Sequence, residues 1–145
     1  IQVNIEREFT GVDFDSAEFE QIIKDVSVEF GVDCASINVL VVGDEKIVEI
    51  NKLFLHRDSA TDVISFDLSD DTCPARLFDI VVNGERSIRQ AEKRGLESKA
   101  ELALYIVHGL LHNLGFDDRL KSSAGIMHEM EDNILQQEGF GKIYD

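Results

Sequence analysis

The sequence predicts an α/β fold: a single domain over residues 1–145, in which a mixed sheet of roughly four strands is covered by helices. Three observations predict it. A chain of 145 residues has the usual length of one domain and can bury roughly 68–70% of the surface that its unfolded form exposes. All strand-like runs end by Val82, with helical patterns between the first three of them, and only helical patterns follow. No repeat, low-complexity tract or linker divides the chain.

The strands are predicted by alternating polarity or by short runs of β-branched and aromatic residues that end at turn residues. They cover residues 2–6, 37–42, 63–66 and 78–82. Apolar residues at helical spacing predict a helix over 16–30, which Asp15 or Ser16 can cap. Similar spacing predicts a short amphipathic helix over 47–54.

The rest of the chain is predicted to form three helices, over 87–94, 98–114 and 122–137. Ser98, with Glu101 three residues later, matches a capping box at the start of the second helix. Apolar residues lie on almost every side of that helix, which is typical of a helix buried at the centre of a fold. We therefore expect it to be the long central helix, although it carries two histidines.

The charge of the chain limits its partners. Lys and Arg number 14 against 29 Asp and Glu, which gives a formal net charge of −15, while 43% of the residues are hydrophobic. Such a chain folds, and its acidic surface repels phosphate backbones. Broad non-specific binding to nucleic acid or to anionic membranes is therefore disfavoured unless the cations gather in one place.

Cysteine usage and hydropathy indicate the compartment. Cys34 and Cys73 form no CxxC pair, so neither a disulfide framework nor a four-thiolate zinc site is predicted, and both are expected to be buried thiols. No signal-like segment opens the chain, and its longest apolar stretch is too short to span a membrane. The sequence predicts a soluble, cytoplasmic protein.

Two histidines on the central helix form a candidate metal site. His108 and His112 are four residues apart, so both imidazoles can point at one place. Gly115 can end the helix and turn the chain back, which offers Asp117 or Asp118 as a third ligand. Two imidazoles and a carboxylate leave an open position for water, as a catalytic zinc requires. The helix-ending glycine and the returning acid favour this interpretation over two ordinary core histidines.

The string HGLLHNLGFDD, residues 108–118, also resembles the signature HGxLHLxGYDH of the YbeY family, whose members are metal-dependent endoribonucleases that mature ribosomal RNA. The resemblance extends from about Ile37 to Phe140. Its further blocks are Asn51, residues 61–66, residues 79–81, Gln90 with Ala91, and Met127, Glu131, Ile134, Gly139 and Phe140.

The resemblance implies a metal-dependent endoribonuclease that hydrolyses phosphodiester bonds of single-stranded RNA with a metal-activated water. It implies a role in ribosomal RNA maturation and ribosome quality control, with ribosomal RNA and the small ribosomal subunit as partners and with neither DNA nor a membrane. The implied cofactor is one zinc ion per chain, or another divalent metal, held by His108, His112 and Asp118. A strand that begins at Thr61 and Asp62 is expected to lie beside the metal-binding helix, so that residues 55–58 form one wall of the cleft.

Three positions depart from the family pattern. Asp118 stands where the family has its third histidine, Leu55 where it has an arginine that can reach a phosphate, and Phe78 where it has a glycine. A cation is still needed to neutralise the charge that develops on the phosphate. Arg57, two residues after Leu55, is the first candidate for this catalytic role, and Arg119 is the second.

Two alternatives to a ribonuclease remain open. The spacing HxxxHxxGxxD resembles the zinc-binding string of metzincin peptidases, but these enzymes need a glutamate directly after the first histidine as general base, and Gly109 stands there. The other alternative is a non-catalytic, ribosome-associated factor with a structural metal.

Overall fold

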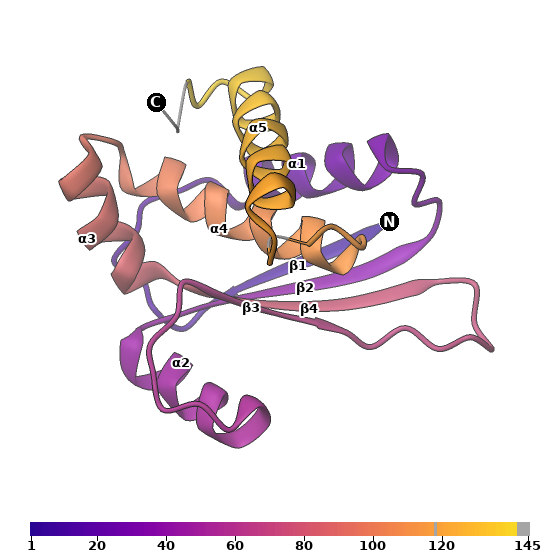
Figure 1. Cartoon of the computed structure of the whole chain (residues 1–145), viewed down its shortest axis with the longest axis horizontal. Coiled ribbons are helices and arrows are strands. Elements are labelled where there is room, and N and C mark those ends of the chain that lie inside the picture. The colour runs from indigo at the N-terminus through magenta and orange to yellow at the C-terminus, as the bar shows by residue number, and fades with distance from the viewer. Residues whose placement is uncertain (118, 142–145) are drawn as a thin grey trace.

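A mixed sheet forms the centre of the fold. Its strands are β1 (Gln2–Arg7), β2 (Ala35–Val42), β3 (Val63–Asp67) and β4 (Arg76–Asn83). They lie in the order β1-β2-β4-β3; the first three in this order are parallel, and β3 is antiparallel to β4 at the edge. The computed structural model describes residues 1–117 and 119–141, and it confirms the predicted four-stranded mixed sheet (Figure 1).

Helices lie on both faces of this sheet. The helical segments are α1 (Ser16–Glu29), α2 (Asp44–Ile50), η1 (Asn51–Leu55), α3 (Gly84–Arg94), α4 (Ser98–Asn113) and α5 (Lys121–Gln137). Figure 1 shows α1, α4 and α5 on one face, α2 on the other, and α3 at one end. Within the described part of the chain, no helix is both long enough and apolar enough to cross a membrane.

The main core lies between the sheet and α1, α4 and α5. It joins inward-facing strand residues such as Ile37 and Phe78 to helix residues such as Phe19 and Leu110, all of which are almost fully buried. Burial of each such side chain contributes about 1.5–3 kcal/mol. Because α4 is buried on nearly every side, it is the central helix that the sequence predicted.

Gly109 lets α4 lie unusually close to the sheet. A Cβ atom at this position would lie 2.9 Å from Val63 Cγ2 and 3.1 Å from Ile80 Cγ2, on β3 and β4. Any larger residue would push the helix away from both strands. The glycine that follows the first histidine therefore sets the depth at which that histidine sits.

The N-terminal caps of α1 and α4 were both predicted from the sequence, and only the cap of α1 is observed. Asp15 is the cap of α1, because its side chain accepts a hydrogen bond from the N–H of Ala17. The predicted capping box at Ser98 is wrong: Glu97 occupies the cap position without a side-chain bond. The Glu101 side chain is buried and pairs with Arg94 of α3 instead.

Two further predictions need correction. The helix predicted over 47–54 is α-helical only as far as Ile50, because the chain continues as the π-helical segment η1. His56, the residue after η1, adopts a left-handed conformation (φ 54°). Cys34 and Cys73 are exposed rather than buried, because they lie outside the strand interiors, before β2 and in the loop between β3 and β4.

Candidate metal centre

Helix α4 places His108 and His112 one turn apart with their rings facing each other. Their Nε2 atoms are 3.0 Å apart, and the ring planes are nearly perpendicular at 81°. Two imidazole nitrogens bound to one tetrahedral zinc ion at about 2.0–2.1 Å would lie about 3.3 Å from each other. The observed pair needs only a small separation to hold an ion, so its geometry fits the two nitrogen positions of a zinc site.

Glu131 of α5 fixes the orientation of the first histidine. Its carboxylate is fully buried, and Oε2 lies 2.5 Å from Nδ1 of His108. A proton held on Nδ1 and donated to Glu131 leaves the lone pair of His108 on Nε2, the atom that faces His112. Carboxylates behind metal-binding histidines play this role in many zinc proteins.

The sequence analysis did not predict the role of Glu131, although the apolar residues around it indicate that it faces the core. Met127 and Ile134, four residues before it and three after, are both buried, so Glu131 occupies the core-facing side of its helix. A carboxylate at such a position is seldom tolerated without a partner. Its partner lies on another helix, which the periodicity of α5 alone does not reveal.

The chain turns back after the second histidine, as predicted. Gly115 adopts a left-handed conformation (φ 101°), and Phe116 returns its N–H to the carbonyl of Leu111. Phe116 then packs edge to face against Phe30 of α1, with ring centroids 5.2 Å apart. This contact holds the returning segment against the body of the protein.

The third ligand is not fixed by the described residues. Asp118, which the resemblance implies, lies outside them. Asp117 forms a short ion pair with Arg119 (2.6 Å), and its hydrogen bonds to Arg119 lower the pKa of the carboxyl. Across residues 1–117 and 119–141, no three His, Cys, Asp or Glu side chains gather closely enough to hold a metal ion. The choice of Asp118 therefore stays a prediction.

A cleft of about 370 Å³ is lined in part by His108, the first histidine of the pair. Its walls come from α3, α4, α5 and the residue before β3. The lining residues are Asp62, Arg86, Gln90, Arg94, Glu101, Leu104, Tyr105, His108 and His128. The volume lies within the range of ligand pockets, about 300–1,000 Å³. His128 of α5 is exposed and takes part in this lining.

The cleft contains a buried acid that is already paired. Glu101 is bound through both carboxylate oxygens by Nη1 of Arg94, at 3.0 and 3.2 Å. Burial raises the pKa of Glu101, and the guanidinium of Arg94 opposes part of that rise. Burial also raises the pKa of Tyr105, with the Glu101 charge as the next cause. Tyr105 therefore stays protonated and can act as a hydrogen-bond donor.

The two arginines proposed for catalysis lie outside this lining. The exposed Arg57 donates its backbone N–H to the carbonyl of Asn51, the first residue of η1, and residues 55–58 are absent from the described walls of the cleft. Arg119 is 86% exposed and pairs with Asp117. Asp62 does line the cleft, and β3 packs on α4 as expected. The wall expected at residues 55–58 therefore stays a prediction.

Known proteins place the chain in a family. A family model described as Endoribonuclease YbeY matches residues 3–139. The chain belongs to the endoribonuclease YbeY family. This membership confirms the predicted family and, with it, the predicted class of enzyme.

Individual relatives agree with this family. The chain is 34% identical over 137 residues to "Endoribonuclease YbeY" of Bacillus licheniformis, with 87% of each chain covered. It is 33% identical over 133 residues to the protein of the same name from Bacillus velezensis, covering 84% of this chain and 85% of that one. A Thermotoga maritima protein solved in solution superimposes with a TM-score of 0.64 at 23% identity, covering 94% of this chain and 89% of that one. That last likeness confirms the fold.

Proposed function

We propose that this YbeY-family chain is a metal-dependent endoribonuclease that hydrolyses single-stranded RNA. The observation that carries the proposal is the convergence of Nε2 of His108 and Nε2 of His112 at 3.0 Å, with the buried Glu131 behind the first ring. Family membership supplies the class of reaction. Zinc is the proposed cofactor, one ion per chain, with Asp118 as the proposed third ligand.

A zinc ion at this position would supply Lewis acidity for a phosphoryl oxygen or for an attacking water. The residues of the chain do the rest. Glu131 holds the Nδ1 proton of His108 and so leaves the lone pair of that ring on Nε2, the atom that faces His112. Because Gly109 stands where a peptidase of the metzincin type needs its glutamate base, the site favours phosphodiester over peptide hydrolysis.

The cleft favours single strands as substrates. The bases of a double-stranded RNA helix stay stacked between a deep, narrow major groove and a wide, shallow minor groove, whereas His108 lines a cleft of about 370 Å³ that an unstacked nucleotide can enter. The nucleotides of a single strand can enter a cleft of this size one at a time. Ribosomal RNA and the small ribosomal subunit as partners, a role in ribosome maturation and quality control, and the cytoplasm as location are proposed from the resemblance of residues 37–140.

The test compares two substitutions of the same type. His112→Asn removes one imidazole from the pair, and His56→Asn removes one from an exposed left-handed position that asparagine tolerates. Zinc-loaded proteins are incubated with single-stranded RNA and, separately, with casein. We expect His112→Asn to lose bound zinc and to cleave RNA more than about 100-fold more slowly, beyond the loss typical of residues that support a ligand, and His56→Asn to cleave normally.

Other outcomes would identify the alternatives. Cleavage of casein that depends on His112 would favour a peptidase. Zinc binding that depends on His112, without cleavage of any RNA, would favour a non-catalytic factor with a structural metal. Equal cleavage by wild type and His112→Asn would contradict the assignment of the site.

A further inference from the structure

Helix α3 presents a row of polar side chains to the cleft. Arg86, Gln90 and Arg94 follow each other at intervals of four residues, so they share one face of the helix, and all three line the cleft. Along a helix, eight residues span about 12 Å. Arg94 lies opposite Glu101 at the start of α4, and Arg86 lies toward Tyr105, one turn before His108. The row therefore runs along the cleft toward the histidines.

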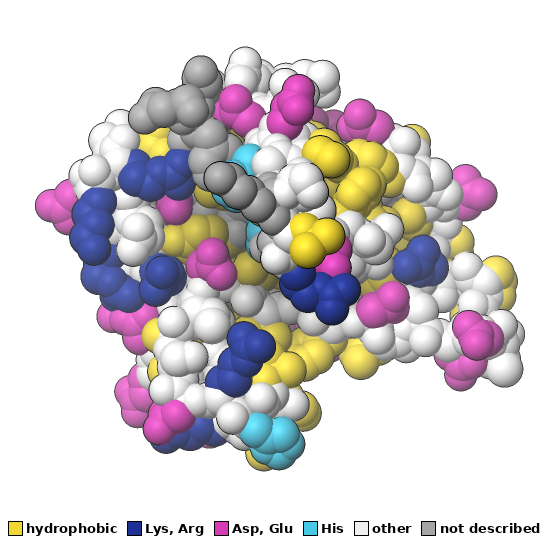
Figure 2. Space-filling model, viewed as in Figure 1, with side chains coloured by type: hydrophobic (Ala, Val, Ile, Leu, Met, Phe, Trp, Pro, Cys, Tyr) yellow, Lys and Arg dark blue, Asp and Glu magenta, His cyan; other side chains and the backbone are white. Residues whose placement is uncertain are grey.

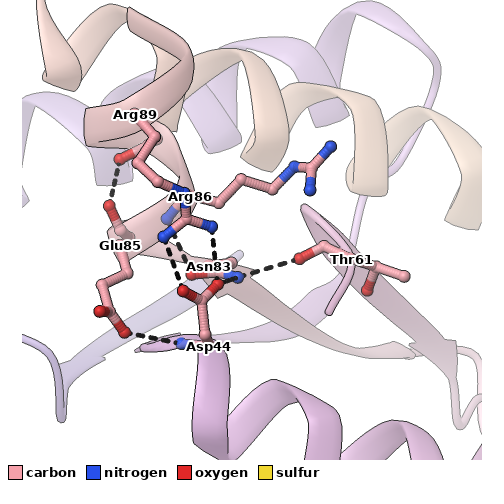
Figure 3. Close-up of polar contacts among 8 residues, drawn as sticks. Asp44, Thr61, Asn83, Glu85, Arg86 and Arg89 are labelled. Atoms are coloured by element: carbon pink, nitrogen blue, oxygen red, sulfur yellow. Dashed lines mark hydrogen bonds and ion pairs between the residues drawn. The ribbon is translucent and has the colours of Figure 1, made fainter. Parts of the chain in front are cut away.

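The arginines of α3 differ in what they bind. Arg89 points out of the cleft and holds Asp44 through two hydrogen bonds of 2.6 and 2.9 Å. Arg94 holds Glu101. Arg86 is half-buried, and among the described residues no carboxylate lies within ion-pair distance of its guanidinium. Figure 3 shows its side chain extending away from the Asp44 cluster toward α4.

A half-buried guanidinium without a carboxylate partner is suited to bind an anion that comes from solution. Its planar fork matches two oxygens of a phosphate. Gln90, one turn further along the same face, adds an amide donor. The local charge also favours binding of an anion. Helix α3 carries four basic and two acidic residues, although the chain has a net charge of −15. Figure 2 shows Lys and Arg side chains gathered on the side where α3 lies.

We propose that Arg86, assisted by Gln90, binds a phosphate of the RNA strand next to the one that is cleaved at the histidine pair. This inference rests on the proposed function, because it assigns the path of the same substrate. The ligand is a phosphodiester of any base sequence, since neither side chain is placed to distinguish bases. Arg86 is thus a substrate-binding residue that positions the strand along α3.

The experiment uses two arginines of the same helix. Arg86→Gln and Arg89→Gln each remove one positive charge from α3, but only Arg86 lines the cleft. Cleavage by zinc-loaded proteins gives kcat and KM for two single-stranded RNA oligonucleotides of unrelated sequence. Fluorescence anisotropy in the His112→Asn background gives the salt dependence of binding without cleavage. Circular dichroism confirms that each variant is folded.

We expect Arg86→Gln to raise KM about 10-fold or more for both oligonucleotides, as the loss of one charged hydrogen-bond donor does. The slope of log K against log salt should fall by about 0.7, the value for one phosphate contact on a single strand. Arg89→Gln should change KM by less than about twofold, because the Arg89 side chain binds Asp44 and does not line the cleft. Arg86→Lys should keep the salt slope and recover part of the affinity.

Each result decides between two ideas. Equal effects of Arg86→Gln and Arg89→Gln would show that only the overall charge of α3 matters, and an unchanged KM and slope for Arg86→Gln would overturn the proposed contact; in both cases the ribonuclease proposal stands if the wild type cleaves RNA. A wild type that neither binds nor cleaves RNA would overturn the proposed function and this inference with it.

Discussion

The protein contains two polar clusters that join distant parts of the chain, and they differ in how their groups are matched. In the first, shown in Figure 3, the buried Asn83 accepts a hydrogen bond from the N–H of Arg86 and donates to Asp44 and to the carbonyl of Thr61. Arg89 binds Asp44 from the other side. Donors meet acceptors throughout, so the cluster is complete within the protein.

The second cluster brings like atoms together. Glu131 holds Nδ1 of His108, and Nε2 of that ring then faces Nε2 of His112 at 3.0 Å. Two imidazole nitrogens at this distance are compatible with one proton or one metal ion between them. The difference shows that a matched cluster fixes the fold, whereas converging acceptors mark the place of a ligand. The following predictions test this distinction.

The largest expected effect is on metal binding. Glu131→Gln keeps the shape of the side chain but removes the charge that holds the His108 proton, so zinc affinity should fall about 10–100-fold. Competition with a chromophoric chelator measures this change. Glu129→Gln, the same substitution at an exposed position of the same helix, should leave zinc affinity unchanged. Equal losses in the two variants would mean that the general charge of α5, and not the contact to His108, acts on the metal.

A substitution in the matched cluster, which contains Asn83, should change the stability of the protein rather than its zinc affinity. Asn83→Ala removes the cap of α3 and leaves its buried partners unsatisfied, so the free energy of unfolding should fall by about 1–3 kcal/mol. Urea denaturation measures this loss. Zinc affinity of the folded variant should stay within about twofold of the wild type, because the clusters are separate. A fall in zinc affinity as large as that of Glu131→Gln would abolish the distinction between them.

Two glycines test how the histidine helix is positioned. Gly109→Ala should lower the free energy of unfolding, because crowding of Val63 and Ile80 costs about 1–3 kcal/mol and outweighs the helix propensity of alanine, about 1 kcal/mol. Gly125 lies on α5 with no atom near an added Cβ. Gly125→Ala should therefore raise the free energy of unfolding by about 0.5–1 kcal/mol. Thermal melts that shift in the same direction for both variants would contradict the close packing of α4.

The smallest effects concern pH, and they have opposite signs. Hydrogen bonds from Arg89 lower the pKa of Asp44 below its ordinary value of 3.8, so the stability that Asp44 contributes is lost as the pH falls from that value through the lower pKa of the folded protein. Burial raises the pKa of Glu101 above 4.5, so the free energy of unfolding falls as the pH rises from 4.5 through the folded pKa. Asp44→Asn should reduce the change in the free energy of unfolding below pH 3.8. Glu101→Gln should reduce the change in the free energy of unfolding above pH 4.5. A Glu101→Gln profile that matches the wild type would show that this carboxyl ionises as freely in the folded protein as in the unfolded chain.

Local patterns predicted the elements of this protein well, since hydrophobic periodicity records which face of each segment is buried. They also predicted the His108 and His112 pair, because both residues lie on one helix. Residues that act across elements were harder to predict. Glu101 looked like a cap because its partner, Arg94, lies on another helix, and the cleft face of α3 depends on how α3 and α4 pack. The cysteines were predicted wrongly because Cys34 lies just before β2 and Cys73 lies in the loop between β3 and β4.

The concentration of basic residues on α3 has a consequence for the speed of RNA capture. At low ionic strength, about 0.01 M, the Debye length is about 30 Å, so an approaching RNA strand experiences the repulsion of the whole acidic molecule. Near 0.15 M, screening shortens this range to about 8 Å, and the strand responds mainly to the charges closest to it. Added salt should thus accelerate association at first, even while it weakens each phosphate contact. The negatively charged surface therefore slows the approach of RNA, whereas the basic residues of α3 attract it at short range.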